Sequence, residues 1–342
     1  MKPVLRSALG LGLLVALAAT VAVIVSPPPL RAAGTEPFEV SARPIRNFHI
    51  GRDETRFGPL EFVGGLELSS TAADFGALSA IRFLTSGKDF IGVADTGFWY
   101  FGKVLRDGEQ GPSGIADFRM IPMVDRSGTI SSRKWEVDAE GLAVKDGIAT
   151  VGFERDHRIA EFKIEKDAMV PLPGEIDFLI PKGELRQNRG FETVAYSNPD
   201  SPLKGSLVIV SEKSLDRQGN IFAAVIEGPK KGIFTVKRNG EFDITDGAFL
   251  PDGDLLLLER SFSMASGVKM RIRRIEGDSI GKGKVADGPV LFTAGMAYQI
   301  DNMEGLDVWT RADGALMVSL VSDDNHSILQ RNLYLEFILH DE

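Results

Sequence analysis

The chain has 342 residues and no cysteine, and its 48 acidic and 39 basic side chains give a formal net charge of −9. The lack of cysteine excludes disulfides and thiol chemistry, and the acidic balance argues against sequence-independent nucleic-acid binding, which needs a basic surface. It favours cations, or compact basic sites within an acidic protein.

The N-terminal segment has the three parts of a secretory signal peptide. Lys2 and Arg6 precede an apolar run over residues 8–25, and residues 32–34 are small. Such a run partitions into a membrane while its basic end stays on the cytoplasmic side. We therefore expect a signal peptide over residues 1–34, a periplasmic or secreted protein, and no membrane contact after cleavage. The run is long, so an uncleaved N-terminal anchor is the alternative.

Short runs of β-forming residues fill the rest of the chain, and no long amphipathic helix is evident. The clearest runs are residues 90–94, 148–152, 207–210, 255–258 and 316–321. Asp-Gly pairs stand between several of them and supply the positive φ that tight hairpin turns need. This pattern predicts an all-β protein built of hairpins.

One unit recurs: an acid, a strand, a turn, a second strand and a closing acid. The opening acids are Glu140, Glu192, Asp246 and Glu304, which are 52, 54 and 58 residues apart. A weaker copy spans residues 79–95. A β unit that recurs at about 40–50 residues or slightly more is typical of a β-propeller blade.

Five units are visible, and residues 60–69 precede the first. We expect this segment to complete a sixth blade with the C-terminal strands and so to close the ring. The prediction is a monomeric six-bladed β-propeller over residues 60–342, with residues 35–59 as a linker or edge segment. Five and seven blades are the alternatives.

The acids of the repeat are expected to meet at one mouth of the central channel. In a hairpin, the first residue of one strand lies beside the last residue of the next. The expected pairs are Glu140 with Glu154, Glu192 with Glu212, Asp246 with Glu259, and Glu304 with Asp323, with Asp95 of the weaker copy at the same mouth. Like charges directly opposite one another destabilise a sheet, so protons, basic side chains or a metal must compensate. The alternative is that these acids only cap strands.

Candidate roles follow from this arrangement. Calcium takes several carboxylate oxygens, and its expected ligands are Glu140, Glu192, Asp246, Glu259, Glu304 and Asp323. Glu154 and Glu212 are the candidate general bases. Basic side chains after the closing acids would hold an anionic substrate, or else neutralise neighbouring acids: Arg155, His157, Arg158, Lys213 and Arg260.

Several motifs resemble a bacterial family described as esterase-like activity of phytase, or phytase-like domain. The motifs lie at residues 138–141, 188–192, 246–260, 302–305 and 322–325, within a similarity over residues 76–339. The resemblance implies a β-propeller, export, and hydrolysis of phosphate or carboxylate esters.

Together these features predict an exported, Ca²⁺-dependent hydrolase of a small anionic ester at the acidic channel mouth. One alternative is a non-catalytic extracytoplasmic propeller that binds a ligand, an envelope polymer or a protein, because one fold hosts many functions. Another is a calcium-dependent, lactonase-like propeller with a largely uncharged substrate.

Overall fold

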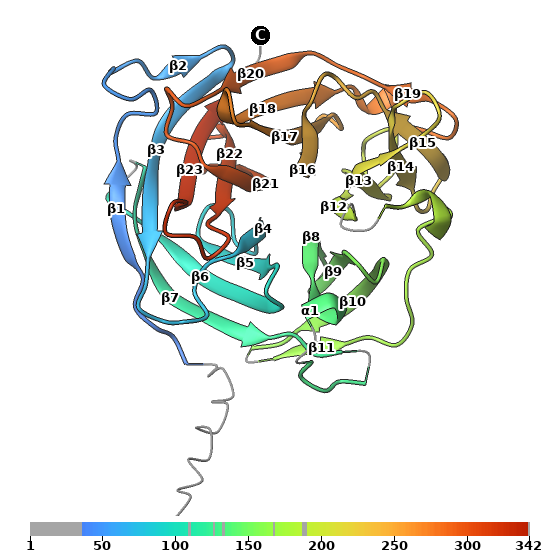
Figure 1. Cartoon of the computed structure of the whole chain (residues 1–342), viewed down its shortest axis with the longest axis horizontal. Helices are drawn as coiled ribbons and strands as arrows, with labels where there is room; N and C mark the ends of the chain where they lie inside the picture. The colour runs from blue at the N-terminus through green and yellow to red at the C-terminus, as the bar shows by residue number, and fades with distance from the viewer. Residues whose placement is uncertain are drawn as a thin grey trace, which may run out of the picture. The chain divides into compact units, whose positions relative to one another are not determined.

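Five sheets surround a central axis as the blades of a β-propeller (Figure 1). The computed structural model describes residues 36–108, 111–125, 127–131, 134–166, 168–186 and 190–340. The expected signal peptide, residues 1–34, lies outside these residues. Within them, no helix is both long and apolar enough to cross a membrane. The all-β propeller prediction is confirmed, but the prediction of six blades is wrong.

Each of the five sequence repeats supplies the two inner strands of one blade. Blade 1 consists of β4 (Leu78–Phe83), β5 (Asp89–Ala94), β6 (Phe98–Arg106) and β7 (Pro112–Pro122). Blade 2 follows a short helix, α1 (Lys134–Val137), and consists of β8 (Ala139–Lys145), β9 (Ile148–Phe153), β10 (Arg158–Ile164) and β11 (Met169–Pro171).

A connection within blade 4 also adds a short strand to the edge of blade 3. Blade 3 consists of β12 (Phe191–Tyr196), β13 (Leu207–Leu215), β14 (Ile221–Val225) and β15 (Gly232–Val236), with 3-10 helix η1 (Lys182–Glu184) before it. Blade 4 consists of β16 (Asp243–Phe249), β17 (Leu255–Ser263), β18 (Gly267–Ile275) and β20 (Val290–Ala294). Between β18 and β20 the chain forms η2 (Gly277–Ser279) and then β19 (Val285–Ala286), which runs parallel to β15 at the edge of blade 3.

Blade 5 joins the two ends of the described chain. Its strands are β21 (Asn302–Thr310), β22 (Leu316–Asp323), β23 (Asn332–Leu339), β3 (Leu60–Ser69) and β1 (Ser41–Ile45), with β2 (Arg56–Phe57) also on β3. The predicted ring closure by residues 60–69 and the C-terminal strands is present, because Leu60 pairs with Leu339 and Leu68 with Asn332. It adds the fourth strand of blade 5, so no sixth blade forms. Part of the expected linker, residues 35–59, forms β1 and β2.

The hydrophobic core lies between neighbouring blades. Trp99 and Ile91 of blade 1 pack with Leu142 and Val151 of blade 2 in one buried cluster. Strand β17 is apolar at every position from Leu255 to Leu258 because both faces of a blade are covered by its neighbours. Inner strands contact one another in the order β4, β8, β12, β16 and β21, and β21 returns to β4.

A buried ion pair crosses the channel between blades 1 and 4. The two terminal guanidinium nitrogens of Arg82, on β4, each donate to Asp246 on β16 at 2.8 Å. Arg82 is 7% exposed and Asp246 is 0% exposed. Arg82 also donates to the Leu306 carbonyl at 2.7 Å, and the Leu306 amide donates to Asp246 at 2.8 Å. This pair, which we call the channel plug, therefore ties β4 and β16 to β21.

Removing one partner of the plug is expected to destabilise the ring strongly. An Arg82→Met variant leaves a buried carboxylate without its cation, which should lower the free energy of unfolding by about 3–5 kcal/mol. Arg311→Met is the control, because the Arg311–Asp313 pair lies at the surface and should contribute about 0–1 kcal/mol. Urea unfolding measures both. Equal stability of the two variants would contradict the assigned role.

Candidate functional site

A β-bulge at the same place in all five inner strands builds the first layer of the site. In each inner hairpin the register skips one residue on the inner strand, and these residues are Ser79, Glu140, Glu192, Thr245 and Glu304. A bulge leaves one residue unpaired and redirects its side chain. Three of the five blades therefore place a glutamate at the channel mouth.

The second layer lies opposite the bulge, on the second strand of each blade. The residues paired with the position just before each bulge are Ala94, Phe153, Ser211, Glu259 and Ser322. The next residues are Asp95, Glu154, Glu212, Arg260 and Asp323. Blade 4 thus contributes an arginine where the other four blades contribute an acid.

These layers surround a pocket of about 190 Å³. Its lining includes seven carboxylates, Asp95, Asp138, Glu140, Glu154, Glu192, Glu212 and Glu304, and three basic side chains, Lys134, Arg155 and Arg260. Asp323 lies next to the pocket, where its carboxylate accepts a 3.5 Å hydrogen bond from the Asn302 amide. The pocket therefore has a large excess of acidic groups.

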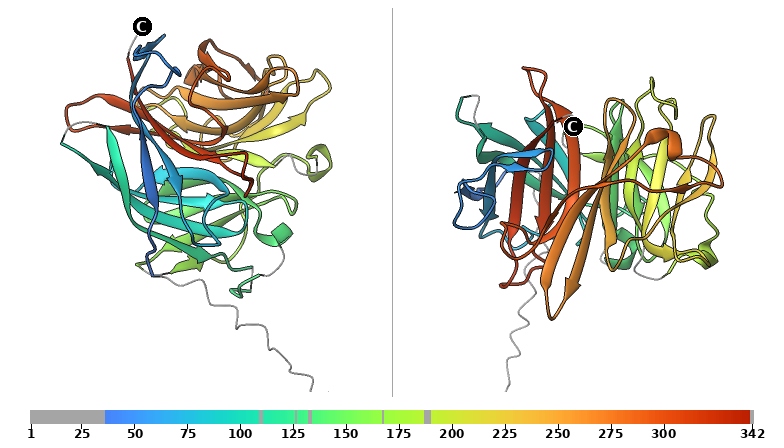
Figure 2. Two further views of the ribbon diagram at one scale, coloured as in Figure 1. Left: turned by 60° about the vertical axis from the view of Figure 1, so that its left-hand side comes forward. Right: turned by 90° about the horizontal axis from the view of Figure 1, so that it is seen from above.

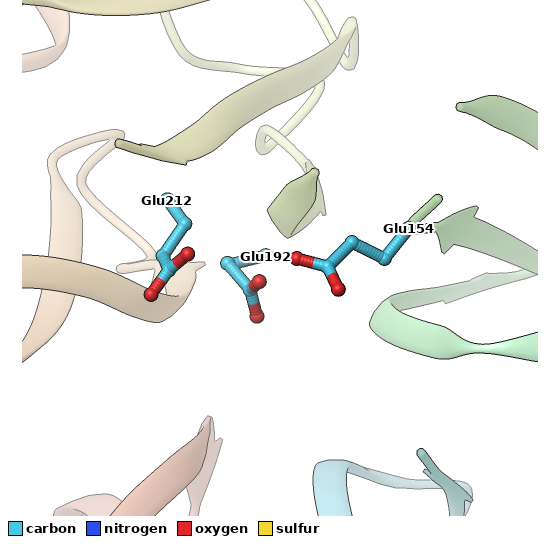
Figure 3. Close-up of side chains that lie close together, drawn as sticks. All are labelled: Glu154, Glu192 and Glu212. Carbon is cyan, nitrogen blue, oxygen red and sulfur yellow. The ribbon is translucent and has the colours of Figure 1, made fainter. Parts of the chain in front are cut away.

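Three of the acids form the candidate metal set. One oxygen from each of Glu154, Glu192 and Glu212 lies within 4.8 Å of the other two, and all three side chains are buried. Figure 3 shows that they point toward one another, with Glu192 in the middle. Oxygen ligands lie about 2.3–2.6 Å from Ca²⁺, so ligands on opposite sides of the ion are about 4.6–5.2 Å apart. The observed spacing fits such an ion.

Glu192 is the central acid, and the described residues give its carboxylate no direct partner. It is 7% exposed, and among the described residues it accepts no hydrogen bond and forms no ion pair. By contrast, Glu154 accepts a 3.4 Å hydrogen bond from the Gly190 amide, and Glu212 lies 3.9 Å from Arg260. A buried carboxylate without a partner is costly unless it binds a proton or a cation.

Burial and crowding raise the pKa values of the acids. Burial, followed by the neighbouring carboxylates, raises the pKa of Glu192 and of Glu140 well above the usual range. The same causes raise the pKa of Glu154 to about 7. Burial raises the pKa of Glu304 to about 8 although Arg260 opposes the shift, and it raises that of Asp323 to about 6.

The three basic side chains each neutralise part of the cluster. Arg260 lies 3.2 Å from Glu304 and also donates to the side-chain oxygen of Asn302. Lys134 on α1 lies 2.7 Å from Asp95, and Arg155 lies 2.7 Å from Asp138. Arg155 and Arg260 were expected from the sequence, and both line the pocket.

Two predicted metal ligands lie elsewhere. Asp246 belongs to the channel plug, and Glu259 forms buried ion pairs with Arg271 and Arg273. The expected pairing of Asp246 with Glu259 is wrong, because Ile244 pairs with Glu259 and Asp246 with Leu258. A shift of one residue turns a strand side chain to the other face. The bulge position of blade 4 is therefore Thr245, and its second position is Arg260.

Three predicted substrate-binding residues also lie outside the pocket lining. The guanidinium of Arg158 is buried 3.7 Å from the centre of the Phe153 ring, and it donates to the Glu136 carbonyl. A ring nitrogen of His157 lies 3.1 Å from the Arg186 carbonyl. Lys213 forms a 2.6 Å ion pair with Asp243. All three side chains therefore contact other parts of the protein and do not line the acidic pocket.

The structure adds Asp138 and Lys134, which the sequence analysis did not single out, and it places Asp95 of the weaker first repeat in the pocket as expected. Asp95 and Asp138 line the pocket, and Lys134 lies between them. Lys134 precedes Asp138 by four residues, which is the spacing of a helical ion pair, and this was the available signal. The Asn302 amide also donates to Glu304 at 2.9 Å.

The sequence that forms this pocket matches a known protein family. The phytase-like family, described as esterase-like activity of phytase, matches residues 73–326, which include all ten pocket residues. Asn188 and Arg189 of one motif lie outside the described residues. No curated protein matches the chain.

Many solved structures resemble the fold at low identity. An aldose sugar dehydrogenase from Streptomyces coelicolor, solved in its PQQ-bound form, shares 14% identity over 88% of this chain and 99% of its own, with a TM-score of 0.40. An endo-arabinase from Bacteroides thetaiotaomicron shares 15% over 78% and 98%, with a TM-score of 0.41. A putative glucose dehydrogenase from Thermus thermophilus shares 12% over 78% and 98%, with a TM-score of 0.39.

The metal-free protein is expected to lose stability as the pH rises. The pKa values of Glu154, Glu304 and Asp323 are raised to about 7, 8 and 6, whereas unfolded carboxyls titrate near about 4. Between these values the folded state binds more protons, so the free energy of unfolding falls from about pH 4 to pH 8. Calorimetry in chelator should show a Tm that decreases over this range.

Calcium should restore stability where the acids are ionised. Because protons compete for the same oxygens, millimolar Ca²⁺ should raise the Tm more at pH 8 than at pH 5.5. Glu192→Gln should abolish this rise, whereas Glu165→Gln, which alters an exposed acid paired with Lys163, should retain it. A rise of equal size at both pH values would contradict the metal assignment.

Proposed function

Because the chain belongs to the family described as esterase-like activity of phytase, we propose that its acidic pocket hydrolyses a phosphate or carboxylate ester. The proposed substrate is small and anionic, and the proposed cofactor is Ca²⁺. The observation that supports the proposal most is the buried carboxylate of Glu192 between Glu154 and Glu212, which has no hydrogen-bond or ion-pair partner among the described residues. The proposed setting is periplasmic or extracellular, and the proposed state is a monomer.

In this proposal Glu154, Glu192 and Glu212 hold the cation. Their spacing and burial suit a hard cation with carboxylate ligands. Glu140 lies beside them and adds a fourth buried carboxyl group. A bound divalent cation supplies Lewis acidity toward the ester oxygen. The proposal makes Glu154 and Glu212 ligands, although the sequence alone suggested them as general bases.

Basic side chains at the pocket wall would bind the negative part of the substrate. Arg260 is well placed because it reaches the cluster from blade 4 between Glu212 and Glu304. An arginine can donate two parallel hydrogen bonds to a phosphate or carboxylate. Lys134 and Arg155 lie on the blade 2 side of the same pocket, so cations stand on both sides of the metal set.

Glu304 is the proposed general base. The Asn302 amide and Arg260 both contact its Oε1 atom, which leaves Oε2 available to accept a proton from water. Its pKa of about 8 lies near neutral pH, where a general base is most effective. In the reaction the water oxygen joins the acyl or phosphoryl group, the ester bond breaks, and a proton passes to the departing alcohol.

Hydrolysis of a chromogenic phosphate monoester and a short acyl ester, with Ca²⁺ or chelator, tests the proposal. Chelator should abolish turnover, and the preferred ester identifies the substrate class. Glu304→Gln should lower kcat by about 10²–10⁴-fold and retain the Ca²⁺-dependent rise in Tm, whereas Glu192→Gln should lose both. Glu165→Gln is the control and should behave like the wild type. Folded protein that turns over neither ester would support the non-catalytic binding propeller.

A further inference from the structure

A buried amide at the edge of the acidic pocket joins the proposed anion-binding arginine to the proposed base. Asn302, the first residue of β21, is 4% exposed. Its Oδ1 atom accepts a hydrogen bond from Arg260 Nη1, and its Nδ2 atom donates to Glu304 Oε1 at 2.9 Å. Nδ2 also donates to Asp323 Oδ2 at 3.5 Å. An amide offers one acceptor oxygen and two donor hydrogens, so Asn302 uses both ends of its side chain here.

The neighbouring charged groups fix the orientation of this amide. Turning it over would place Oδ1 beside the ionised carboxylates of Glu304 and Asp323, and Nδ2 beside the guanidinium of Arg260. Acceptors would then face acceptors and donors would face donors, and unpaired buried polar groups are costly. An amide serves a guanidinium and a carboxylate at once, whereas an aspartate in its place would lack the donor and a leucine would lack both groups. Figure 2 shows that β21 and β17 belong to neighbouring blades.

The backbone that carries Asn302 is held from two sides. Within blade 5, Asn302 pairs in register with Asp323 of β22. From blade 4, the bulge residue Thr245 is 1% exposed, and its hydroxyl donates to the Met303 carbonyl at 3.0 Å. The chain between Asn302 and Glu304 is therefore fixed by hydrogen bonds that involve neither side chain. A functional group holds its neighbours well only when its own position is fixed in this way.

Among the described residues, Asn302 is the uncharged side-chain partner of Arg260. The other partners of the guanidinium are Glu304, 3.2 Å away, and Glu212, 3.9 Å away. In the proposed function Glu212 binds the cation and Glu304 takes up and releases a proton, so both ion pairs change strength during a reaction cycle. The amide of Asn302 does not titrate. Its hydrogen bond to Nη1 therefore persists when the charges of the two acids change.

We propose that Asn302 is a positioning residue that holds Arg260 and Glu304 at a constant separation, so that the group that binds the anion and the group that takes the proton act on one substrate. The inference rests on the function proposed above and gives Asn302 no reaction step of its own. Oδ1 supports substrate binding through Arg260, and Nδ2 supports proton transfer through Glu304. The two ends of one amide therefore have separate kinetic effects.

Two substitutions separate these effects in ester hydrolysis. Asn302→Asp keeps an acceptor for Arg260 but loses the donor to Glu304, so it should lower kcat by at least about tenfold and change KM by less than about threefold. Asn302→Leu loses both groups and should also raise KM by at least about tenfold. Asn239→Leu is the control, because its amide donates to Asp287 at 3.3 Å outside the pocket, and it should behave like the wild type. Equal rises in KM for both Asn302 variants, or wild-type kinetics in both, would overturn the inference.

A double-mutant cycle shows whether Asn302 acts through Arg260. Arg260→Met alone should raise KM by at least about tenfold, and adding Asn302→Leu should raise it no further, because the amide then has no guanidinium to hold. Two KM effects that multiply independently would contradict the positioning role. Both Asn302 variants should keep the Ca²⁺-dependent rise in Tm as evidence of an intact fold, since the hydrogen bonds of Asn302 involve no member of the metal set.

Anion binding gives a readout that needs no turnover. Isothermal titration calorimetry in Ca²⁺ uses methylphosphonate and acetate as probes of the phosphate and carboxylate classes. The wild type and Asn302→Asp should bind the preferred anion, whereas Asn302→Leu and Arg260→Met should bind it at least about tenfold more weakly. Ester hydrolysis by the wild type with unchanged anion binding in Asn302→Leu would overturn the inference and leave the proposed function intact. A wild type that neither hydrolyses an ester nor binds an anion would overturn the proposed function, and the inference with it.

Discussion

The channel plug is the interaction on which the rest of the site depends. Arg82 and Asp246 meet across the axis and bind the backbone of β21, so the pair blocks the channel one residue beyond the blade 4 bulge at Thr245 and three residues beyond the blade 1 bulge at Ser79. Without this closure the acidic side chains would line a water-filled channel, where their charges would be screened. With it they line a pocket that is blocked at its inner end, where burial lowers the effective dielectric and each carboxylate strongly affects the next.

The same closure explains why ionised acids would lower the stability of the metal-free protein and why they would favour a bound cation. Seven carboxylates and three basic side chains line one small pocket, and burial disfavours their charged forms. The metal-free protein must therefore retain protons on several of them at neutral pH. A cation that replaces these protons gains the interaction energy of preorganised ligands, because the bulges and the packed blades already hold the side chains in place. In the proposal, cation binding and the loss of metal-free stability with rising pH thus have one cause.

Much of this arrangement could be predicted from the sequence, and the errors have physical reasons. The repeat revealed the blades and the acid pairs Glu140–Glu154 and Glu192–Glu212. The blade count failed because residues 60–69 complete the fourth strand of blade 5, which the repeat spacing does not reveal. Asp246 and Glu259 were misassigned because an acid-glycine pair resembles the other units, while the strand register places Thr245 and Arg260 at the mouth. Arg158 begins β10, and its guanidinium lies over Phe153, a contact that spacing from an acid does not show.

The central claim is that Glu154, Glu192 and Glu212 form a Ca²⁺ site, and isothermal titration calorimetry of the metal-free protein tests it most directly. Titrations near pH 7.5 in two buffers of different ionisation enthalpy report Ca²⁺ binding and the protons that it displaces. The account predicts saturable binding with proton release in the wild type and in Glu165→Gln, and loss of both in Glu192→Gln. Binding that Glu192→Gln leaves unchanged, or binding without proton release, would contradict it.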